Sequence, residues 1–269
     1  FKRFRLLLLL FYDHYYYYSV LTHVDREVSD FGKINKKCSL TDDGCMEALY
    51  TDFLKEIADN GIPEFSVPKM DPMIIKNMEL DALGMIKVTV KEGEAHGFKS
   101  CKVTGYKNDL ANHRNTLDFV CDAFDIAGTY KVESTPTLLA LIGGINVHGE
   151  GNVKAAVEQI HLSFDFAYEI KKLDDGEYHF LLRPDDSTYE FEVKGKTTVQ
   201  LDDIYIGKQE ISTVLVNIFN ENSEFLVNNF GKVAIDQTLD LFYENVQKFF
   251  TGIPAKELLT DDLTPYVKN

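Results

Sequence analysis

The stretch that decides the fold runs from residue 201 to residue 251 and reads LDDIYIGKQEISTVLVNIFNENSEFLVNNFGKVAIDQTLDLFYENVQKFFT. From Phe225 to Phe250 its apolar residues recur at spacings of three and four and point in several directions around a helix. A helix of this kind requires burial on nearly all sides. Its polar residues form a narrow line that recurs every fourth residue and winds by about 40° per step around the axis. A curved sheet wrapped around the helix suits this pattern, although an ordinary buried core helix is the alternative.

The residues before this helix change to a period of two, which is typical of half-buried β-strands. In the longest such run, residues 161–170, apolar and aromatic side chains alternate with polar or small ones. Shorter alternating runs lie at residues 86–90, 117–121, 178–182, 189–193 and 197–201. Turn-forming residues at 184–186 and 195–196 separate the last three runs. The pattern predicts a meander of long antiparallel strands with one aromatic-rich apolar face.

A shorter helix is predicted upstream of the strands, between Cys45 and Gly61. Asp42 or Asp43 provides its N-cap, and Gly61 followed by Pro63 ends it. Its apolar residues share one face and are Met46, Leu49, Tyr50, Phe53, Leu54 and Ile57. Because only one face is apolar, this helix is expected on the outside or at the end of another layer. The order of helix, antiparallel sheet and long helix predicts the α+β class.

The sequence predicts a disulfide for one pair of its four cysteines and leaves the pairing of the other two open. Cys38 and Cys45 are separated by six residues, which suits a small disulfide loop and not the short CxxC spacing of zinc sites. The alternative is a pair of buried reduced thiols. Cys101 and Cys121 lie on two strand-like stretches joined by a turn, and the sequence leaves open whether they pair.

Composition limits the classes of function. A chain of 269 residues with 45% hydrophobic and 26% charged residues can form one large domain or two small ones. Its net charge of -15 argues against nucleic acid and against anionic membrane surfaces as partners. No segment after the N-terminal region is long and apolar enough to span a bilayer, so stable membrane insertion is not expected.

The first 30 residues differ from the rest of the chain. Lys2, Arg3 and Arg5 precede the apolar residues 6–12, an order that is similar to the charged and apolar regions of a secretion signal. A frayed N-terminal tail is the alternative. We therefore expect residues 1–30 to be a signal-like or disordered tail and residues 31–269 to form a single domain of a secreted, extracellular protein.

Several motifs occur together between Cys38 and Tyr266. The cysteine pair stands before a helix that ends in Gly61-Ile62-Pro63. The later motifs are Gly128-Thr129-Tyr130, Gly149-Glu150-Gly151, Asp202-Asp203-Ile204-Tyr205-Ile206-Gly207 and Phe219-Asn220-Glu221-Asn222-Ser223. In this combination the chain resembles the insect takeout and haemolymph juvenile-hormone-binding protein family, in which Trp usually stands where Ser223 lies.

The resemblance implies a long curved antiparallel sheet wrapped around the long C-terminal helix, with a short N-terminal helix. It also implies that residues 31–269 form a hydrophobic-ligand-binding domain with a tunnel for one small elongated apolar ligand. The side chains expected to line the tunnel are Tyr130, Phe164, Phe166, Tyr168, Phe242 and Phe249. For each of them, ordinary core packing is the alternative. The two tyrosines are favoured for a directional ligand contact, because a buried hydroxyl requires a hydrogen-bond partner.

Motifs of enzymes are absent from the sequence. It contains no Gly-x-Ser-x-Gly, no HExxH and no phosphate-binding glycine loop, and its seven histidines are scattered. The histidines are expected on the surface or on a strand face. We predict no catalytic residue, no metal and no cofactor. The leading hypothesis is a monomeric secreted carrier of a juvenile-hormone-like terpenoid or a fatty-acid-like lipid. The alternative is a signalling or interaction protein of the same fold with a filled tunnel.

Overall fold

The structure is a computed structural model that describes residues 36–82 and 84–267. One compact unit begins at Lys37, and the elements discussed below belong to this unit. The tail predicted for residues 1–30 lies outside the described residues.

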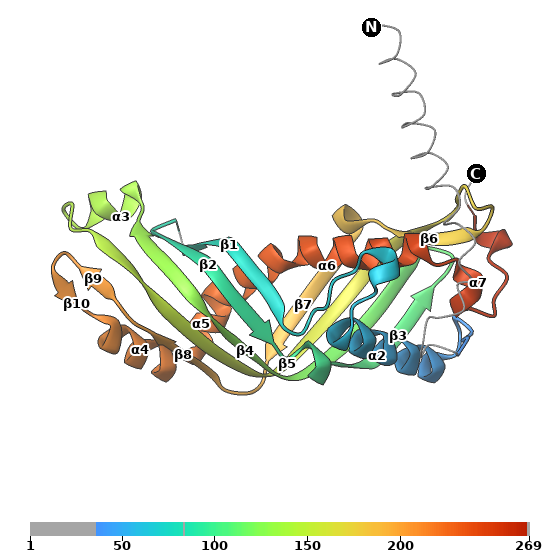
Figure 1. The fold of residues 1–269 in the computed structure, drawn as a ribbon, viewed down its shortest axis with the longest axis horizontal. Helices are drawn as coiled ribbons and strands as arrows, with labels where there is room; N and C mark the ends of the chain where they lie inside the picture. The colour runs from blue at the N-terminus through green and yellow to red at the C-terminus, as the bar shows by residue number, and fades with distance from the viewer. Residues whose placement is uncertain (1–35, 83, 268–269) are drawn as a thin grey trace, which may run out of the picture. The chain divides into compact units, whose positions relative to one another are not determined.

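Two long neighbouring strands form the centre of an antiparallel sheet, which has ten strands in the described part of the chain (Figure 1). They are β4 (Arg114–Ser134) and β5 (Val147–Lys172), which pair along most of their length. The other strands are β1 (Met73–Ala82), β2 (Ile86–His96), β3 (Lys102–Asp109), β6 (Tyr178–Leu182), β7 (Thr188–Val193), β8 (Thr197–Leu201), β9 (Ile204–Ile206) and β10 (Gln209–Glu210). The sheet and the helices together form the predicted α+β fold.

Short strands follow one another along the outer edges of β4 and β5. The strands β6, β7, β8 and β9 pair in turn with β5, from its C-terminal end to its N-terminal end. Together they form one interrupted strand antiparallel to β5. On the other side, β2 and β3 pair with successive parts of β4 and form a second interrupted strand. The strand β1 pairs with the outer edge of β2. The predicted meander is therefore wrong for residues 178–201, because the chain does not reverse at 184–186 or 195–196.

The residues that suggested turns instead mark the interruptions of this strand. Pro184 begins a short 3₁₀ turn, η4 (Pro184–Asp186), and proline cannot donate a hydrogen bond to the ladder. At Gly195 a Cβ atom would lie only 2.6 Å from the carbonyl oxygen of Glu158, so the two backbones approach closely at this point. These residues predict chain reversal, but in the structure they mark local breaks in strand pairing.

The buried face of β5 carries even-numbered residues at one end of the strand and odd-numbered residues at the other end. Near its C-terminal end the even-numbered residues from Phe164 to Ile170 are buried, whereas Val147 at the other end belongs to the odd-numbered set. The change occurs around Gln159, whose φ is 51°. A residue in this left-handed region interrupts the strict alternation of an extended strand. The register between β4 and β5 is the same on both sides of this point.

The helices lie along the sheet (Figure 1). They are α2 (Asp43–Asp59), α3 (Pro136–Leu141), α4 (Ser212–Glu221), α5 (Ser223–Leu226), α6 (Lys232–Gly252) and α7 (Ala255–Leu258), with short 3₁₀ turns η2 (Pro63–Phe65), η3 (Phe98–Ser100) and η6 (Thr264–Tyr266). The helix predicted as one rod is divided by a π-helical turn, η5 (Val227–Gly231), between α5 and α6.

Burial around the C-terminal helix is uneven. Tyr243, Phe249 and Phe250 are buried in the C-terminal half of α6. By contrast, Leu241 is 38% exposed and Phe225 is 47% exposed. The expectation of burial on nearly all sides is therefore wrong for part of this segment, where Lys232, Asp236 and Glu244 of the polar line are exposed as well.

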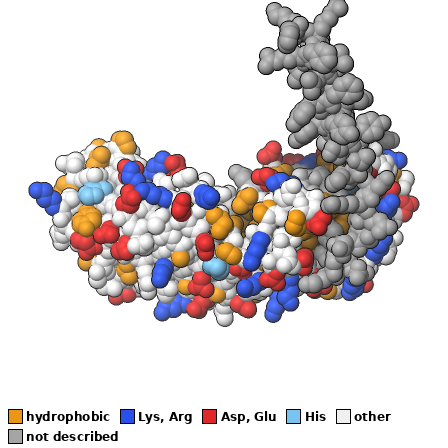
Figure 2. Space-filling model, viewed as in Figure 1, with side chains coloured by type: hydrophobic (Ala, Val, Ile, Leu, Met, Phe, Trp, Pro, Cys, Tyr) orange, Lys and Arg blue, Asp and Glu red, His pale blue; other side chains and the backbone are white. Residues whose placement is uncertain are grey.

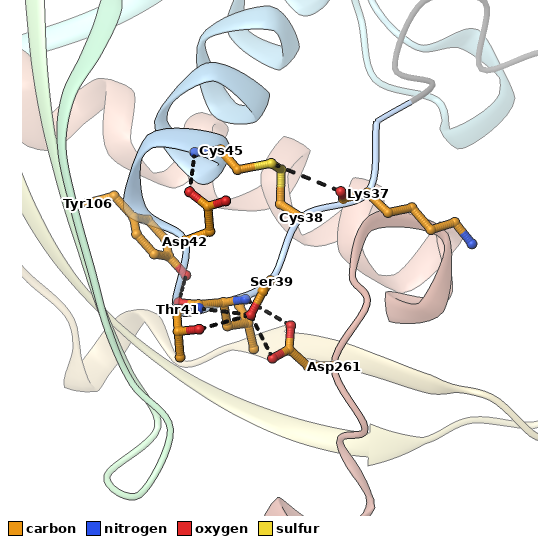
Figure 3. Close-up of a disulfide and its surroundings, with 9 residues drawn as sticks. Lys37, Cys38, Ser39, Thr41, Asp42, Cys45, Tyr106 and Asp261 are labelled. Atoms are coloured by element: carbon orange, nitrogen blue, oxygen red, sulfur yellow. Dashed lines mark hydrogen bonds between the residues drawn. A yellow bond between two sulfur atoms is a disulfide. The ribbon is translucent and has the colours of Figure 1, made fainter.

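Both cysteine pairs are joined as disulfides in the structure. Cys38 and Cys45 have sulfur atoms 2.08 Å apart, and the bond closes a loop in front of α2 (Figure 3). Asp42 lies inside this loop and caps α2, because its carboxylate accepts a hydrogen bond from the backbone N–H of Cys45 at 3.0 Å. Cys101 and Cys121, whose pairing the sequence left open, are also joined, with sulfur atoms 2.03 Å apart; Cys101 directly precedes β3 and Cys121 lies on the neighbouring strand β4.

The segment at the first disulfide is also fixed to the C-terminal segment. The backbone N–H of Cys38 donates to the carbonyl oxygen of Leu258 at 3.0 Å. The carboxylate of Asp261 accepts two further hydrogen bonds, one from the backbone N–H of Leu40 at 2.8 Å and one from the hydroxyl of Ser39 at 3.1 Å (Figure 3). The two ends of the unit are therefore held together by hydrogen bonds at one place.

Candidate functional site

Three phenylalanine rings meet where β5 faces α6. Phe164 and Phe166 are two residues apart on a strand and therefore point to the same face. Their rings are stacked, with centroids 5.1 Å apart. The ring of Phe242 on α6 lies 5.6 Å from that of Phe164 and 6.3 Å from that of Phe166. These three predicted site residues are thus brought together at the interface between helix and sheet.

Phe249 lies further along the same helix. It is 2% exposed, and its ring centroid is 4.0 Å from that of Phe53 on α2 and 6.1 Å from that of Phe65 in η2. The ring centroid of Phe249 is 5.2 Å from that of the adjacent Phe250. The ring centroid of Phe250 is in turn 6.0 Å from that of Phe180 on β6, which connects Phe249 to the sheet. Phe249 is therefore the point where the N-terminal helix, the C-terminal helix and the sheet meet.

Tyr168 is buried on the same face as Phe166, but its hydroxyl is already bound within the protein. It donates to the side-chain oxygen of Asn108 at 2.8 Å, and its ring is stacked on that of His113 at 5.5 Å. Burial raises the pKa of Tyr168 to about 12, while the hydrogen bond to Asn108 acts in the opposite direction. The hydroxyl is consequently neutral and engaged with Asn108.

Tyr130 lies in a different part of the sheet from the other five residues. It is opposite Gly151 on β5, whereas Phe164 is opposite Leu117 on β4. At about 3.3 Å per residue these two positions are roughly 40 Å apart along the strand. Tyr130 packs in a cluster with Val132, Val147 and Ile204, and its hydroxyl donates to the carbonyl oxygen of Asp202 at 2.6 Å. Its surroundings raise its pKa, first by burial and then by the charge of Asp202.

Two histidines have roles that the sequence did not indicate. His113 is 4% exposed and His179 is 1% exposed, so both belong to the interior. The Nδ1 atom of His179 is 3.1 Å from the carbonyl oxygen of Phe250, and its Nε2 atom is 2.8 Å from the carboxylate of Asp175. Both ring nitrogens thus lie within hydrogen-bond distance of an oxygen atom. His179 therefore fastens the turn between β5 and β6 to the C-terminal end of α6.

The described residues show neither a basic patch on the face in Figure 2 nor a cluster suited to a metal ion. On the face shown in Figure 2, acidic and basic side chains are interspersed over the coloured residues. Among the described residues, no group of three or more His, Cys, Asp or Glu side chains is placed to hold a metal ion. No helix in the described part of the chain combines the length and hydropathy needed to cross a membrane.

Comparisons with known proteins agree on one family. A sequence model of the haemolymph juvenile hormone binding protein family matches residues 18–260. The juvenile hormone-binding protein of Manduca sexta is 26% identical over 157 residues, which is 57% of this chain and 63% of that protein. The alignment thus spans less than two thirds of that relative. The crystal structure of Takeout 1 from Epiphyas postvittana matches with a TM-score of 0.73 and 24% identity, covering 84% of this chain and 99% of that one, and shows that the fold is shared.

Proposed function

Because this chain belongs to the haemolymph juvenile hormone binding protein family, we propose that it is a carrier that holds one small elongated apolar ligand between the sheet and α6. Its mechanism is burial of the ligand and not chemical conversion. The name of the Manduca sexta relative supports a juvenile-hormone-like terpenoid, and a fatty-acid-like lipid has the same general chemistry. Two disulfides support a secreted, extracellular location, because such bonds persist in oxidising compartments.

The observation that carries the proposal is the half-buried apolar side of α6. Ile235, Leu239 and Phe242 lie on one side of the helix and are all only partly buried, although the helix packs against the sheet. A ligand that covers such side chains removes apolar area from water, at about 25 cal/mol per Å². The Phe164, Phe166 and Phe242 rings provide the aromatic end of this surface.

A second function has its own supporting observation. The three rings pack on one another, and the hydroxyls of Tyr130 and Tyr168 are both bound within the protein. Such contacts are expected where protein side chains fill the space between helix and sheet. The second candidate is therefore a signalling or interaction protein that keeps the fold without carrying a ligand.

Native mass spectrometry and probe binding separate the two candidates. For a carrier, we expect co-purified lipid, and displacement of a fluorescent fatty acid by juvenile hormone or by unlabelled fatty acid. Phe242→Ala is expected to weaken binding, because it removes a ring from the aromatic surface. Leu241→Ala is the matched control, since Leu241 is the preceding residue on α6 and is 38% exposed. Absence of any bound lipid and of any probe binding would favour the second candidate.

A further inference from the structure

A buried amide in α6 has no partner within the protein. Asn245 is 1% exposed. Neither its side-chain oxygen nor its side-chain nitrogen has a hydrogen-bond partner among the described residues, 36–82 and 84–267. Buried polar side-chain atoms in native proteins are almost always paired. An amide that is unpaired at both atoms therefore needs a specific explanation.

The position of Asn245 on α6 suggests what that explanation is. Asn245 is three residues after Phe242 and four residues before Phe249, so the three side chains are neighbours on one helix face. Phe242 contacts the rings of β5, and Phe249 contacts Phe53 of α2. Asn245 therefore stands between the two aromatic contacts of the helix, in the surface proposed to receive the ligand.

Two other polar side chains in the C-terminal half of α6 are paired. Gln247 accepts a hydrogen bond from the backbone N–H of Leu182 at 2.8 Å and so fastens the helix to β6. Thr251 donates to the carbonyl oxygen of Gln247 within the helix. Leucine has the same branched arrangement of heavy atoms as asparagine, although it is larger, and it has no polar atom to leave unpaired. Packing alone thus gives no reason for an amide here.

We infer that Asn245 is the polar contact for the end group of the ligand, and that this end group is a neutral hydroxyl. The inference rests on the proposed carrier function. The amide presents an N–H donor and a carbonyl acceptor side by side, and a hydroxyl can both accept from the first and donate to the second. An ester satisfies only the donor, since it has no hydrogen to give.

A charged carboxylate fits the position less well than a hydroxyl. The nearest cation along the helix is Lys248, which is paired with Glu244 at 2.6 Å and whose side chain is 36% exposed. An unpaired carboxylate would be buried beside Asn245 without a counter-charge, which is strongly unfavourable. Among terpenoid and fatty-acid-like ligands, the alcohol is therefore the expected form, ahead of the ester or the ionised acid of the same chain length.

The test compares ligands that differ only at the end group. Displacement of the apolar fluorescent probe N-phenyl-1-naphthylamine is measured for 1-tetradecanol, methyl tetradecanoate and tetradecanoate at neutral pH. In the parent protein we expect the alcohol to bind about tenfold more tightly than the ester, as two hydrogen bonds replace one. In Asn245→Leu we expect the two affinities to become equal while probe binding is retained. Gln247→Leu is the control, and its alcohol-to-ester ratio should remain that of the parent.

The possible results have separate meanings. If neither the probe nor any of the three compounds binds to the parent protein, the carrier function fails and the inference fails with it. If all bind but the parent shows equal affinity for alcohol and ester, the carrier function stands and the role of Asn245 is overturned. The same conclusion follows if Asn245→Leu raises the melting temperature but leaves the ratio of the parent unchanged, because the amide is then paired with internal water. Even where a variant does not fold, equal affinities for alcohol and ester in the parent protein overturn the role of Asn245.

Discussion

The hydroxyl of Tyr168 is expected to contribute to the stability of the protein and not to ligand affinity. It donates to Asn108, so its removal breaks a hydrogen bond of the protein itself. We expect Tyr168→Phe to lower the free energy of unfolding by about 1 kcal/mol, measured by urea denaturation, with ligand affinity unchanged. In an Asn108→Leu background the same substitution should cost close to nothing. A loss of ligand affinity without a loss of stability would contradict this assignment.

The raised pKa of Tyr168 also predicts how stability depends on pH. Tyrosine in an unfolded chain ionises near pH 10, whereas burial raises the pKa of Tyr168 to about 12 in the folded protein. Its contribution to stability is therefore complete below about pH 10 and is lost as the pH rises through about 12. We expect urea midpoints to fall less over this range in Tyr168→Phe than in the parent. Parallel profiles for the two proteins would show that Tyr168 does not titrate in this way.

Single residues of the candidate site were predictable from the sequence only where the strand alternation is regular. Phe164, Phe166 and Tyr168 lie on one buried face, as their spacing of two indicates. The burial of His179 was not predictable, because its partners Asp175 and Phe250 come from a turn and from the end of a distant helix. Asn245 was not predicted as a site residue, although its spacing from Phe242 and Phe249 places it on their apolar face and outside the polar line of the helix.

At the scale of elements, Gln159 is where β5 departs from an ideal strand. Its φ of 51° is tolerated by asparagine and glycine but is strongly disfavoured for a β-branched residue. We expect Gln159→Val to lower the free energy of unfolding by about 1–3 kcal/mol, measured by urea denaturation. Gln159→Asn should have little effect. Equal stability of the valine variant and the parent would mean that β5 does not need this conformation.

The types and approximate positions of many elements were predictable, although β1, α3 and α4 were not predicted, and the connections were predictable only in part. Local periodicity identified α2, the long strands and the C-terminal helix, because each has a regular apolar pattern. It could not distinguish a turn from an interruption, since Pro184 and Gly195 produce the same local signal in both cases. The difference depends on which strand edge the following residues meet, and here β6 to β9 all meet β5.

At the scale of the whole unit, the two disulfides constrain segments of different length. Cys38 and Cys45 are separated by 7 positions, and Cys101 and Cys121 by 20. In the chain-entropy model their removal costs about 2.5 and about 3.3 kcal/mol respectively, because longer loops lose more freedom on closure. We expect the Cys101→Ser, Cys121→Ser double variant to be destabilised by roughly 1 kcal/mol more than the Cys38→Ser, Cys45→Ser double variant. The reverse order would show that native contacts, and not loop length, set the difference.

The Cys38–Cys45 loop also contains the residues that contact the C-terminal segment. The energetic coupling between the disulfide and this contact can therefore be tested. Asp261 accepts hydrogen bonds from Ser39 and from Leu40, both of which lie within that loop. In the parent protein Asp261→Ala should cost about 1.5–3 kcal/mol, the usual range for hydrogen bonds to a charged group. If the disulfide holds Ser39 and Leu40 in place, Asp261→Ala should cost much less in the Cys38→Ser, Cys45→Ser background. A double-mutant cycle by urea denaturation measures this coupling, and strictly additive losses would show that the Asp261 contact forms independently of the disulfide.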